Sequence, residues 1–333
     1  MFVSNKTSKN SLKILISYHK PSIILSNNIF CPIHVGRDLA TETSKDGKMG
    51  KQDYMWMLHN MIGDNTGDNI SGLNRYFNET TSMYWAWKNY EKLDNPAYIG
   101  FMHYRRHFMT NNEFYDNVFL PYGNKYYQKI NTKYLQEAHI SEKYYLELLN
   151  NNPDIICMKP FITEDSVLEN FTRIVPNVNR ETMLLTSKIV KNLYPEYSET
   201  IDNYYKSTKN IWYHSFIMKK ELFFEYMEWL FPILFRVHSN LDYSNIKHFE
   251  TQREVAYMAE RLFAVWVNYK IKQGFNVKYV QLSIVGDTER INFKPLHIRI
   301  LRKFGDFLLS CLTLNTKKIK NRFIQLTLEK DLK

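Results

Sequence analysis

Two histidines and two arginines stand within residues 103–107, directly after an apolar run. The segment reads YIGFMHYRRHF over residues 98–108. Arginine offers a planar fork of donors that can hold a phosphate through two hydrogen bonds, and a neighbouring histidine can add a hydrogen bond or a metal bond. Read as one strand, His103, Arg105 and His107 share a face and Arg106 lies on the other. The segment predicts a phosphate-binding strand end; the alternative is an exposed strand end with solvated charges.

A loop rich in glycine and short polar residues precedes this segment. It reads GDNTGDNISG over residues 63–72. Glycine permits positive φ, and Asx side chains bond nearby backbone N–H groups, so the loop can cap the helix that follows. Its spacing matches neither a calcium EF-hand loop nor a Walker phosphate loop. We expect Asp64, Asp68 and Asn69 either to begin that helix or to face a substrate.

Charged and polar residues are also embedded in apolar sequence nearer the C-terminus. Glu260 and Arg261 lie in a segment, 252–270, that is apolar most of the way round. Buried charges are costly unless they are paired or used, so these two form either a structural ion pair or part of a site. His214 lies within another apolar run, residues 211–218, and is a further candidate.

These candidates are placed by an alternating order of strands and helices. Apolar runs predict strands over residues 12–18, 29–35, 98–108, 154–158 and 211–218. Periodic apolar residues predict helices over residues 73–90, 141–150, 219–235 and 252–270, of which the third should kink or end at Pro232. Residues 163–210 show a weak pattern and are interpreted as an insertion that is mobile or contacts an acceptor. The order is that of a nucleotide-binding α/β sheet, whose ligand lies outside the carboxyl ends of the strands.

Composition places the chain among folded proteins of a reducing compartment. The 333 residues are 44% apolar and 15% aromatic, enough for a large core. The cysteines, Cys31, Cys157 and Cys311, are few and widely spaced, so neither a disulfide framework nor a cysteine-based zinc site is indicated. The N-terminus lacks the apolar run of a signal peptide, and no later run approaches the ~18 apolar residues of a membrane span. We expect a cytoplasmic protein.

The net charge of +10 is concentrated near the C-terminus. Residues 294–333 hold ten basic and three acidic residues, interleaved with leucine, isoleucine and phenylalanine. This pattern predicts one or two basic amphipathic helices that suit an anionic membrane surface, such as the inner face of the plasma membrane. The alternative is a final helix that packs its apolar face on the body. We expect two domains, residues 1–290 and a basic tail, residues 291–333.

Seven motifs distributed over about residues 12–285 identify a family in combination. They are KILISYHKP (13–21), GDNTGDNIS (63–71), YWAWKN (84–89), GFMHYRRH (100–107), FIMKK (216–220), WLFPILF (229–235) and AERL (259–262). With them the chain resembles the glycosyltransferases of bacterial capsule, exopolysaccharide and O-antigen gene clusters, formerly known only as a domain of unknown function and including galactofuranosyltransferases. The resemblance implies a GT-A-like α/β fold, a nucleotide-binding mixed sheet flanked by helices with a helical C-terminal extension. It also implies transfer of a hexose, such as galactofuranose, from a UDP-sugar to a growing surface polysaccharide.

This resemblance gives the candidate residues defined roles. GT-A enzymes commonly hold a divalent cation with Asp-x-Asp after a Trp-rich helix, where this chain has His103-Tyr-Arg105. We expect no metal requirement; the alternative is Mn²⁺ or Mg²⁺ held by His103 with Asp64 or Asp68. The expected nucleotide-sugar-binding residues are His19, Lys20, Asp64, Asp68, Asn69, His103, Arg105 and Arg106. The expected acceptor- or sugar-binding residues are His214, Arg253 and Arg261.

The expected reaction is a direct displacement with inversion. Glu260, or second Glu254, takes the proton from a hydroxyl of a glycan or lipid-linked glycan, while Arg105, Arg106 and Lys20 stabilise the departing nucleotide. The alternative is a non-catalytic basic protein of a membrane surface or of nucleic acid. A nucleic-acid-binding protein would show clustered basic and aromatic residues outside the tail. The sequence lacks such a cluster, so we expect no nucleic-acid partner.

Overall fold

The structure is a computed structural model that describes residues 11–43, 48–110, 125–163, 165–174, 179–244 and 252–286. The chain divides into two units, Met1–Val285 and Gly286–Lys333. The expected basic tail lies outside the described residues, so the tail and the boundary near residue 290 stay predictions. Among the described residues, no helix is long and apolar enough to cross a membrane.

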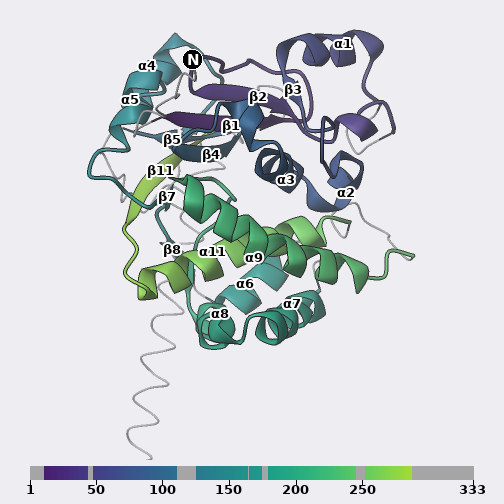
Figure 1. Ribbon diagram of the computed structural model, residues 1–333, viewed down its shortest axis with the longest axis vertical. Coiled ribbons are helices and arrows are strands. Elements are labelled where there is room, and N and C mark those ends of the chain that lie inside the picture. The colour runs from purple at the N-terminus through teal and green to yellow at the C-terminus, as the bar shows by residue number, and fades with distance from the viewer. Residues whose placement is uncertain are drawn as a thin grey trace, which may run out of the picture. The chain divides into compact units, whose positions relative to one another are not determined.

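Among the described residues, a mixed sheet of nine strands forms the centre of the first unit (Figure 1). Its strands are β1 (Leu12–Tyr18), β2 (Phe30–His34), β3 (Ile62–Gly63), β4 (Tyr98–His103), β5 (Arg106–Met109), β6 (Lys125–Tyr127), β7 (Ile155–Met158), β10 (Phe216–Lys219) and β11 (Val277–Val285). The order is β10-β7-β11-β5-β4-β1-β2-β3, with β6 paired to β11 and a further pairing between β10 and β4. Strands β4, β1, β2 and β3 run parallel, while β10 and β5 run antiparallel to their partners. The expected mixed sheet is confirmed.

Helices surround this sheet. They are α1 (Lys51–Asn60), α2 (Asn74–Phe77), α3 (Thr80–Lys88), α4 (Thr132–Glu137), α5 (Glu142–Glu147), α6 (Val167–Ile174), α7 (Arg180–Leu193), α8 (Ser198–Lys206), α9 (Lys220–Ser239) and α11 (Glu254–Lys272). Helices α9 and α11 lie between the sheet and α6, α7 and α8 (Figure 1). Helix α9 continues through Pro232 to Ser239, so the helix does not end at that proline, and the alternative of a kink there stays a prediction.

Both faces of the sheet are buried. Along β1, Leu15 enters a core shared with α3, α7, α8, α9 and α11. Its neighbours Ile14 and Ile16 enter a second core, which is shared with α4 and α5. Because successive side chains of a strand point to opposite faces, a strand buried on both sides reads as a continuous apolar run. The run over residues 12–18 therefore folds as predicted.

The expected strand over residues 98–108 is wrong, because the chain reverses within it. Strand β4 ends at His103, Tyr104 and Arg105 form a turn, and β5 starts at Arg106, antiparallel to β4. The expected grouping of His103, Arg105 and His107 on one face is therefore also wrong. His107 is fully buried, and its Nδ1 lies 2.6 Å from the hydroxyl of Tyr134.

The expected single helix over residues 73–90 is interrupted. Helix α2 ends at Phe77, Asn78 has φ 46° and ψ −131°, and α3 begins at Thr80. A right-handed helix cannot pass through a residue with positive φ. The break places Glu79 at the start of α3 with a direction that a continuous helix would not give it.

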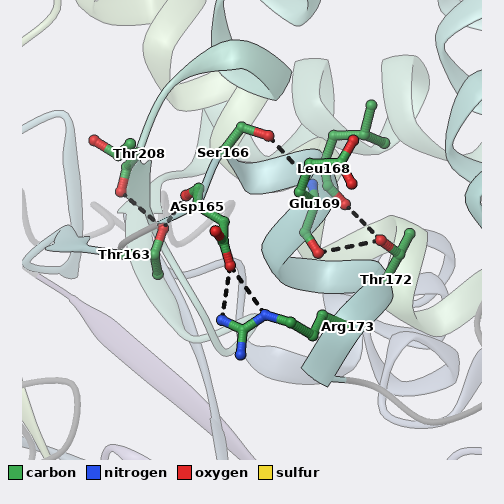
Figure 2. A network of polar contacts seen from close by, with 8 residues as sticks. All are labelled: Thr163, Asp165, Ser166, Leu168, Glu169, Thr172, Arg173 and Thr208. Atoms are coloured by element: carbon green, nitrogen blue, oxygen red, sulfur yellow. Dashed lines mark hydrogen bonds and ion pairs between the residues drawn. The ribbon is translucent and has the colours of Figure 1, made fainter. Parts of the chain in front are cut away.

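The stretch whose pattern is weak, residues 163–210, folds into α6, α7 and α8. Figure 2 shows the polar contacts at its start: the Thr163 hydroxyl donates to the carbonyl of Thr208 at 3.1 Å, and the Arg173 guanidinium lies 2.8 Å from the carboxylate of Asp165. Ser166 Oγ accepts a hydrogen bond from the backbone N–H of Glu169. These contacts tie the first turns of α6 to the segment before β9 (Lys209–Asn210), which pairs with β8 (Phe161–Ile162). The stretch is therefore helical, and hydrogen bonds join the segments at its two ends.

Candidate active site

The carboxyl ends of β1 and β4 bring a group of cationic and imidazole side chains together. Ser17 of β1 is in register with His103 of β4, so the residues that follow each strand are neighbours. The rings of His19 and His103 have centroids 6.3 Å apart, and His19 also lies edge-on to Tyr104 at 5.4 Å. Arg106 starts β5 opposite His103. The arrangement matches the strand-end position at which open α/β sheets bind ligands.

His103 is held as a neutral ring. Its Nδ1 accepts a hydrogen bond of 3.2 Å from the backbone N–H of Arg105. Burial, reinforced by the neighbouring cations, chiefly Arg106, lowers the pKa of His103 well below its ordinary value. A neutral imidazole that accepts at Nδ1 carries its proton on Nε2. His103 therefore offers one N–H donor at the strand end.

The two arginines lie against aromatic rings. The Arg106 guanidinium lies over the ring of Tyr213 at 4.2 Å, and that of Arg105 over Tyr104 at 5.2 Å. Stacking holds a guanidinium by its face and leaves its N–H edge available for a phosphate. Tyr213 has φ 62°, an uncommon conformation for a bulky residue, and such strain concentrates at functional sites.

A small cavity of about 10 Å³ lies behind these side chains, enough for roughly one water. Its polar lining comes from β1, the α2–α3 junction, β4, β5 and the segment before β10: Ser17, Glu79, His103, Arg106, His214 and Ser215. Glu79 is the acidic member, and the sequence reasoning missed it. Its signal is the Asn-Glu-Thr-Thr run over residues 78–81, in which asparagine tolerates positive φ and threonine favours a helix start.

Glu260 and Arg261 form an ion pair beside this cavity. Glu260 Oε2 accepts a hydrogen bond of 3.1 Å from Arg261, whose side chain is 1% exposed, against 18% for Glu260. Arg261 also donates to Asn210 Oδ1 at 2.7 Å. Burial raises the pKa of Glu260, the charge of Glu79 raises it further, and the cations of Arg261 and Arg106 oppose the shift. The ion pair that was one of two alternatives for these residues is present, and the charges of Glu79 and Arg106 both act on its carboxylate.

His214 lines the same cavity from the segment before β10. Its Nε2 lies 2.7 Å from the hydroxyl of Tyr226. Burial, aided by the charge of Arg261, lowers the pKa of His214 to about 3, so the ring is neutral at physiological pH. His214 thus lines the same cavity as Arg106 and His103, and Arg261 acts on it through its charge. A sugar- or acceptor-binding role for His214 and Arg261 stays a prediction.

Comparison with known proteins places this arrangement in a family. The model of a domain of unknown function, DUF4422, matches residues 13–272. The chain belongs to the DUF4422 family. The apo structure of WbbM, a bifunctional glycosyltransferase, matches with a TM-score of 0.70 and 28% identity over 83% of the chain. The match covers 46% of WbbM, so the chain corresponds to less than half of that protein. A search of curated proteins finds no match.

This likeness confirms the expected family and the GT-A-like sheet flanked by helices. Within this fold, the Gly-rich loop of the DUF4422 chain, residues 63–72, has a structural role. Asp64 is fully buried, and its carboxylate accepts four hydrogen bonds, from the N–H groups of Gly36 and Arg37 and from the hydroxyls of Ser71 and Thr81. Burial raises the pKa of Asp64 against the effect of these bonds. We leave Asp64 out of the proposed ligand contacts.

The other two candidate residues of the loop, Asp68 and Asn69, make local contacts within the protein. Asn69 Nδ2 donates to the carbonyl of Gly67 at 2.9 Å, and its Oδ1 accepts from the N–H of Ser71. Asp68 is exposed, and its backbone carbonyl accepts from Asn89 Nδ2 at 2.9 Å. These contacts fit the helix-starting alternative for the loop.

Two further candidates of the DUF4422 chain lie at the start of α11, away from the cavity. Glu254 is buried and accepts a hydrogen bond from the hydroxyl of Thr182 on α7, and burial raises its pKa. It lies six residues before Glu260, ~9 Å along the helix axis. Arg253 directly precedes α11. On the other side of the cluster, Lys20 is half-buried next to exposed His19.

The side chains at the strand ends are more cationic than anionic. In the described part of the chain, no group of three or more His, Cys, Asp or Glu side chains is arranged to hold a metal ion. The carboxylate of Asp64 is taken up by four protein donors, and burial and the charges of Arg106 and Arg105 lower the pKa of His103. A cation placed beside His103 would meet these positive charges, with Glu79 as the carboxylate in the cavity lining.

Proposed function

We propose that this DUF4422 protein transfers a sugar from a nucleotide-activated donor to a growing surface glycan. The single observation that carries the proposal is the group at the ends of β4 and β5, a neutral His103 with an N–H to donate beside the stacked guanidinium of Arg106. This group lies in a fold like that of a bifunctional glycosyltransferase. Following the resemblance, the donor would be a UDP-hexose such as UDP-galactofuranose, and the product a capsular, exopolysaccharide or O-antigen glycan.

In the proposed reaction, cationic donors neutralise the charge that develops on the leaving diphosphate. Arg105 and Arg106 supply two guanidinium groups and His103 an N–H, and such preorganised donors act most strongly where charge develops. The cavity behind them is far smaller than the 300–1,000 Å³ typical of ligand pockets, at about 10 Å³. The first contacts with the donor would therefore fall on the exposed His19 and on Lys20 and Arg105 beside it, and the cavity would open as the sugar enters.

The proposal assigns the neutralising role to these side chains and needs no metal ion. Its test is the release of UDP from UDP-galactose, UDP-glucose and UDP-galactofuranose, with a soluble sugar or water as acceptor, in the presence of EDTA. We expect at least one donor to give UDP release that Arg106→Ala abolishes. Turnover that appears only with Mn²⁺ would refute the metal-free role. Absence of release from any donor under every condition would favour a binding protein.

The basic segment after residue 293 is the basis of a second proposal, which concerns where in the cell the protein acts. We propose that it holds the enzyme on an anionic membrane, where a lipid-linked acceptor would be presented. Deletion of residues 294–333 should abolish binding to vesicles that contain phosphatidylglycerol and leave UDP release on soluble acceptors unchanged. Loss of both would show that the segment belongs to the folded body.

A further inference from the structure

Glu79 lines the candidate site, and its carboxylate has no partner in the part of the chain that the structure describes. It lines the cavity together with His103 and Arg106. The side chain is half-buried and, within the described residues, makes no hydrogen bond or ion pair. Glu260, by contrast, is bonded to Arg261 and is absent from the cavity lining. Of the two carboxylates, Glu79 is the one placed to contact a molecule that enters beside Arg106.

The backbone that carries Glu79 is strained and held in that state. Asn78 has φ 46° and ψ −131°, a conformation that costs a non-glycine residue of order 1–3 kcal/mol. Its carbonyl accepts hydrogen bonds from Asn74 Nδ2 at 2.7 Å and from the Thr81 N–H at 3.2 Å. Two donors on one carbonyl fix the turn. This turn ends α2 and sends the next residue toward the ends of β1 and β4.

The same turn is tied to the Gly-rich loop and to the sheet. The Thr81 hydroxyl lies 2.7 Å from the carboxylate of Asp64, which is buried in that loop. The carbonyl of Glu79 itself accepts from the hydroxyl of Ser82 at 2.6 Å, and that hydroxyl lies 3.1 Å from Ser17 Oγ on β1. Asp64 and Thr81 thus act as positioning residues, and the loop that reads as a ligand site in sequence serves to aim Glu79.

We propose that Glu79 is the catalytic carboxylate of the transfer, an inference that rests on the proposed function. The acceptor hydroxyl gives its proton to Glu79 while its oxygen forms a bond to the anomeric carbon of the donor sugar. The bond from that carbon to the diphosphate oxygen breaks, and the diphosphate leaves with the electron pair beside Arg106 and the N–H of His103. Glu260, held by Arg261, stays behind the cavity as a fixed neighbouring charge.

The test compares Glu79→Gln, Glu260→Gln and, as a surface control, Glu91→Gln, with the UDP-sugar that gives most UDP release. Each protein is measured twice, for UDP affinity by calorimetry and for kcat. Because loss of a general base typically lowers the rate 10²–10⁴-fold, we expect Glu79→Gln to lower kcat at least 100-fold with UDP affinity within threefold of wild type. Glu260→Gln should have a smaller effect on kcat, and Glu91→Gln none.

A positioning variant separates geometry from folding. Thr81→Val removes the hydroxyl that donates to Asp64 and should lower kcat while UDP affinity is retained. Unchanged kcat in a Glu79→Gln protein that binds UDP would overturn the inference alone. Loss of UDP affinity in that variant would overturn it too, because Glu79 would then serve the donor or the fold. Absence of UDP binding by the wild-type protein would overturn the proposed function itself.

Discussion

His103 and Arg106 are paired across the antiparallel contact between β4 and β5, on either side of a turn made by Tyr104 and Arg105. This pairing fixes an imidazole and a guanidinium side by side at the end of a strand. The fold, not a flexible loop, sets their separation, because β4 is held by β1 and β10, and β5 by β11. Functional groups on paired strands keep their geometry before a ligand arrives.

The pairing predicts a large effect of Arg106→Ala on nucleotide binding. Hydrogen bonds to charged groups contribute roughly 1.5–3 kcal/mol, so the affinity for UDP should fall at least tenfold. Isothermal titration calorimetry in EDTA measures this affinity for UDP. Arg236→Ala, which removes an exposed arginine near the end of α9, is the matched control and should leave UDP affinity unchanged. Equal affinities in the two variants would remove Arg106 from the site.

Gly100 predicts a packing limit under the same strand. It is in register with Ile14 of β1 and with Ile217 of β10, and an added Cβ would lie 2.7 Å from Ile217 Cγ1 and 3.1 Å from Ile14 Cγ1. Gly100→Ala should therefore lower the free energy of unfolding by about 1–3 kcal/mol, as overpacking does in other cores. Gly72→Ala, where a Cβ meets nothing within 4 Å, is the control. Urea unfolding of both variants measures the difference in stability. Equal urea midpoints would contradict the packing described around Gly100.

Asp64 and Asp68 offer a paired test of the Gly-rich loop. Asp64→Ala leaves two buried N–H groups and two hydroxyls without their acceptor. An unsatisfied buried donor costs roughly 1–3 kcal/mol, so the variant should lose about 3 kcal/mol or more of unfolding free energy. Asp68→Ala, on an exposed residue of the same loop, should change stability by no more than about 0.5 kcal/mol. Similar urea midpoints for the two variants would return Asp64 to a ligand role.

His107 predicts a loss of stability in acid. Burial lowers its pKa to about 3 in the folded protein, against about 6.5 when unfolded. Since the unfolded chain gains the proton first, stability is complete above pH 6.5 and falls as the pH drops from 6.5 towards 3. The linkage amounts to about 2 kcal/mol at pH 5. His107→Gln should make the fall of the unfolding free energy between pH 7 and 5 smaller by about 2 kcal/mol, while the other buried histidines, such as His214, keep their share. An unchanged slope would mean that the ring is already charged in the fold.

The parts of the fold that sequence reasoning predicted well are those in which one physical cause dominates. The strand over residues 12–18 and the helix that became α11 are buried on nearly all sides, so their apolar runs are long and unambiguous. The turn between β4 and β5 was missed because Tyr104 and Arg105 are not the glycine or asparagine that signals a two-residue hairpin. A hairpin that is stabilised by neighbouring strands does not need the typical residues in its own turn, so the sequence of the turn does not reveal it.

The candidate site likewise contains residues that the sequence singles out and one residue that it does not. His103, Arg106, Glu260 and Arg261 are candidates in the sequence because charge in an apolar run is rare enough to be informative. Glu79 was missed because its place depends on the strained turn at Asn78, which is held by contacts from Asp64 and Thr81. Asp64 itself looked like a ligand residue, since acidic residues that cap a backbone and those that bind a substrate have the same sequence pattern. Only the four hydrogen bonds distinguish the two.

The central claim is that the strand-end cluster binds a nucleotide diphosphate without a metal. The most direct measurement is the thermal midpoint of the full chain with and without excess UDP, in EDTA and in Mn²⁺. UDP at ~100 times its dissociation constant should stabilise the fold by about 2.7 kcal/mol, and we predict that the midpoint rises by the same amount in both solutions. A midpoint that UDP leaves unchanged in EDTA would contradict the account.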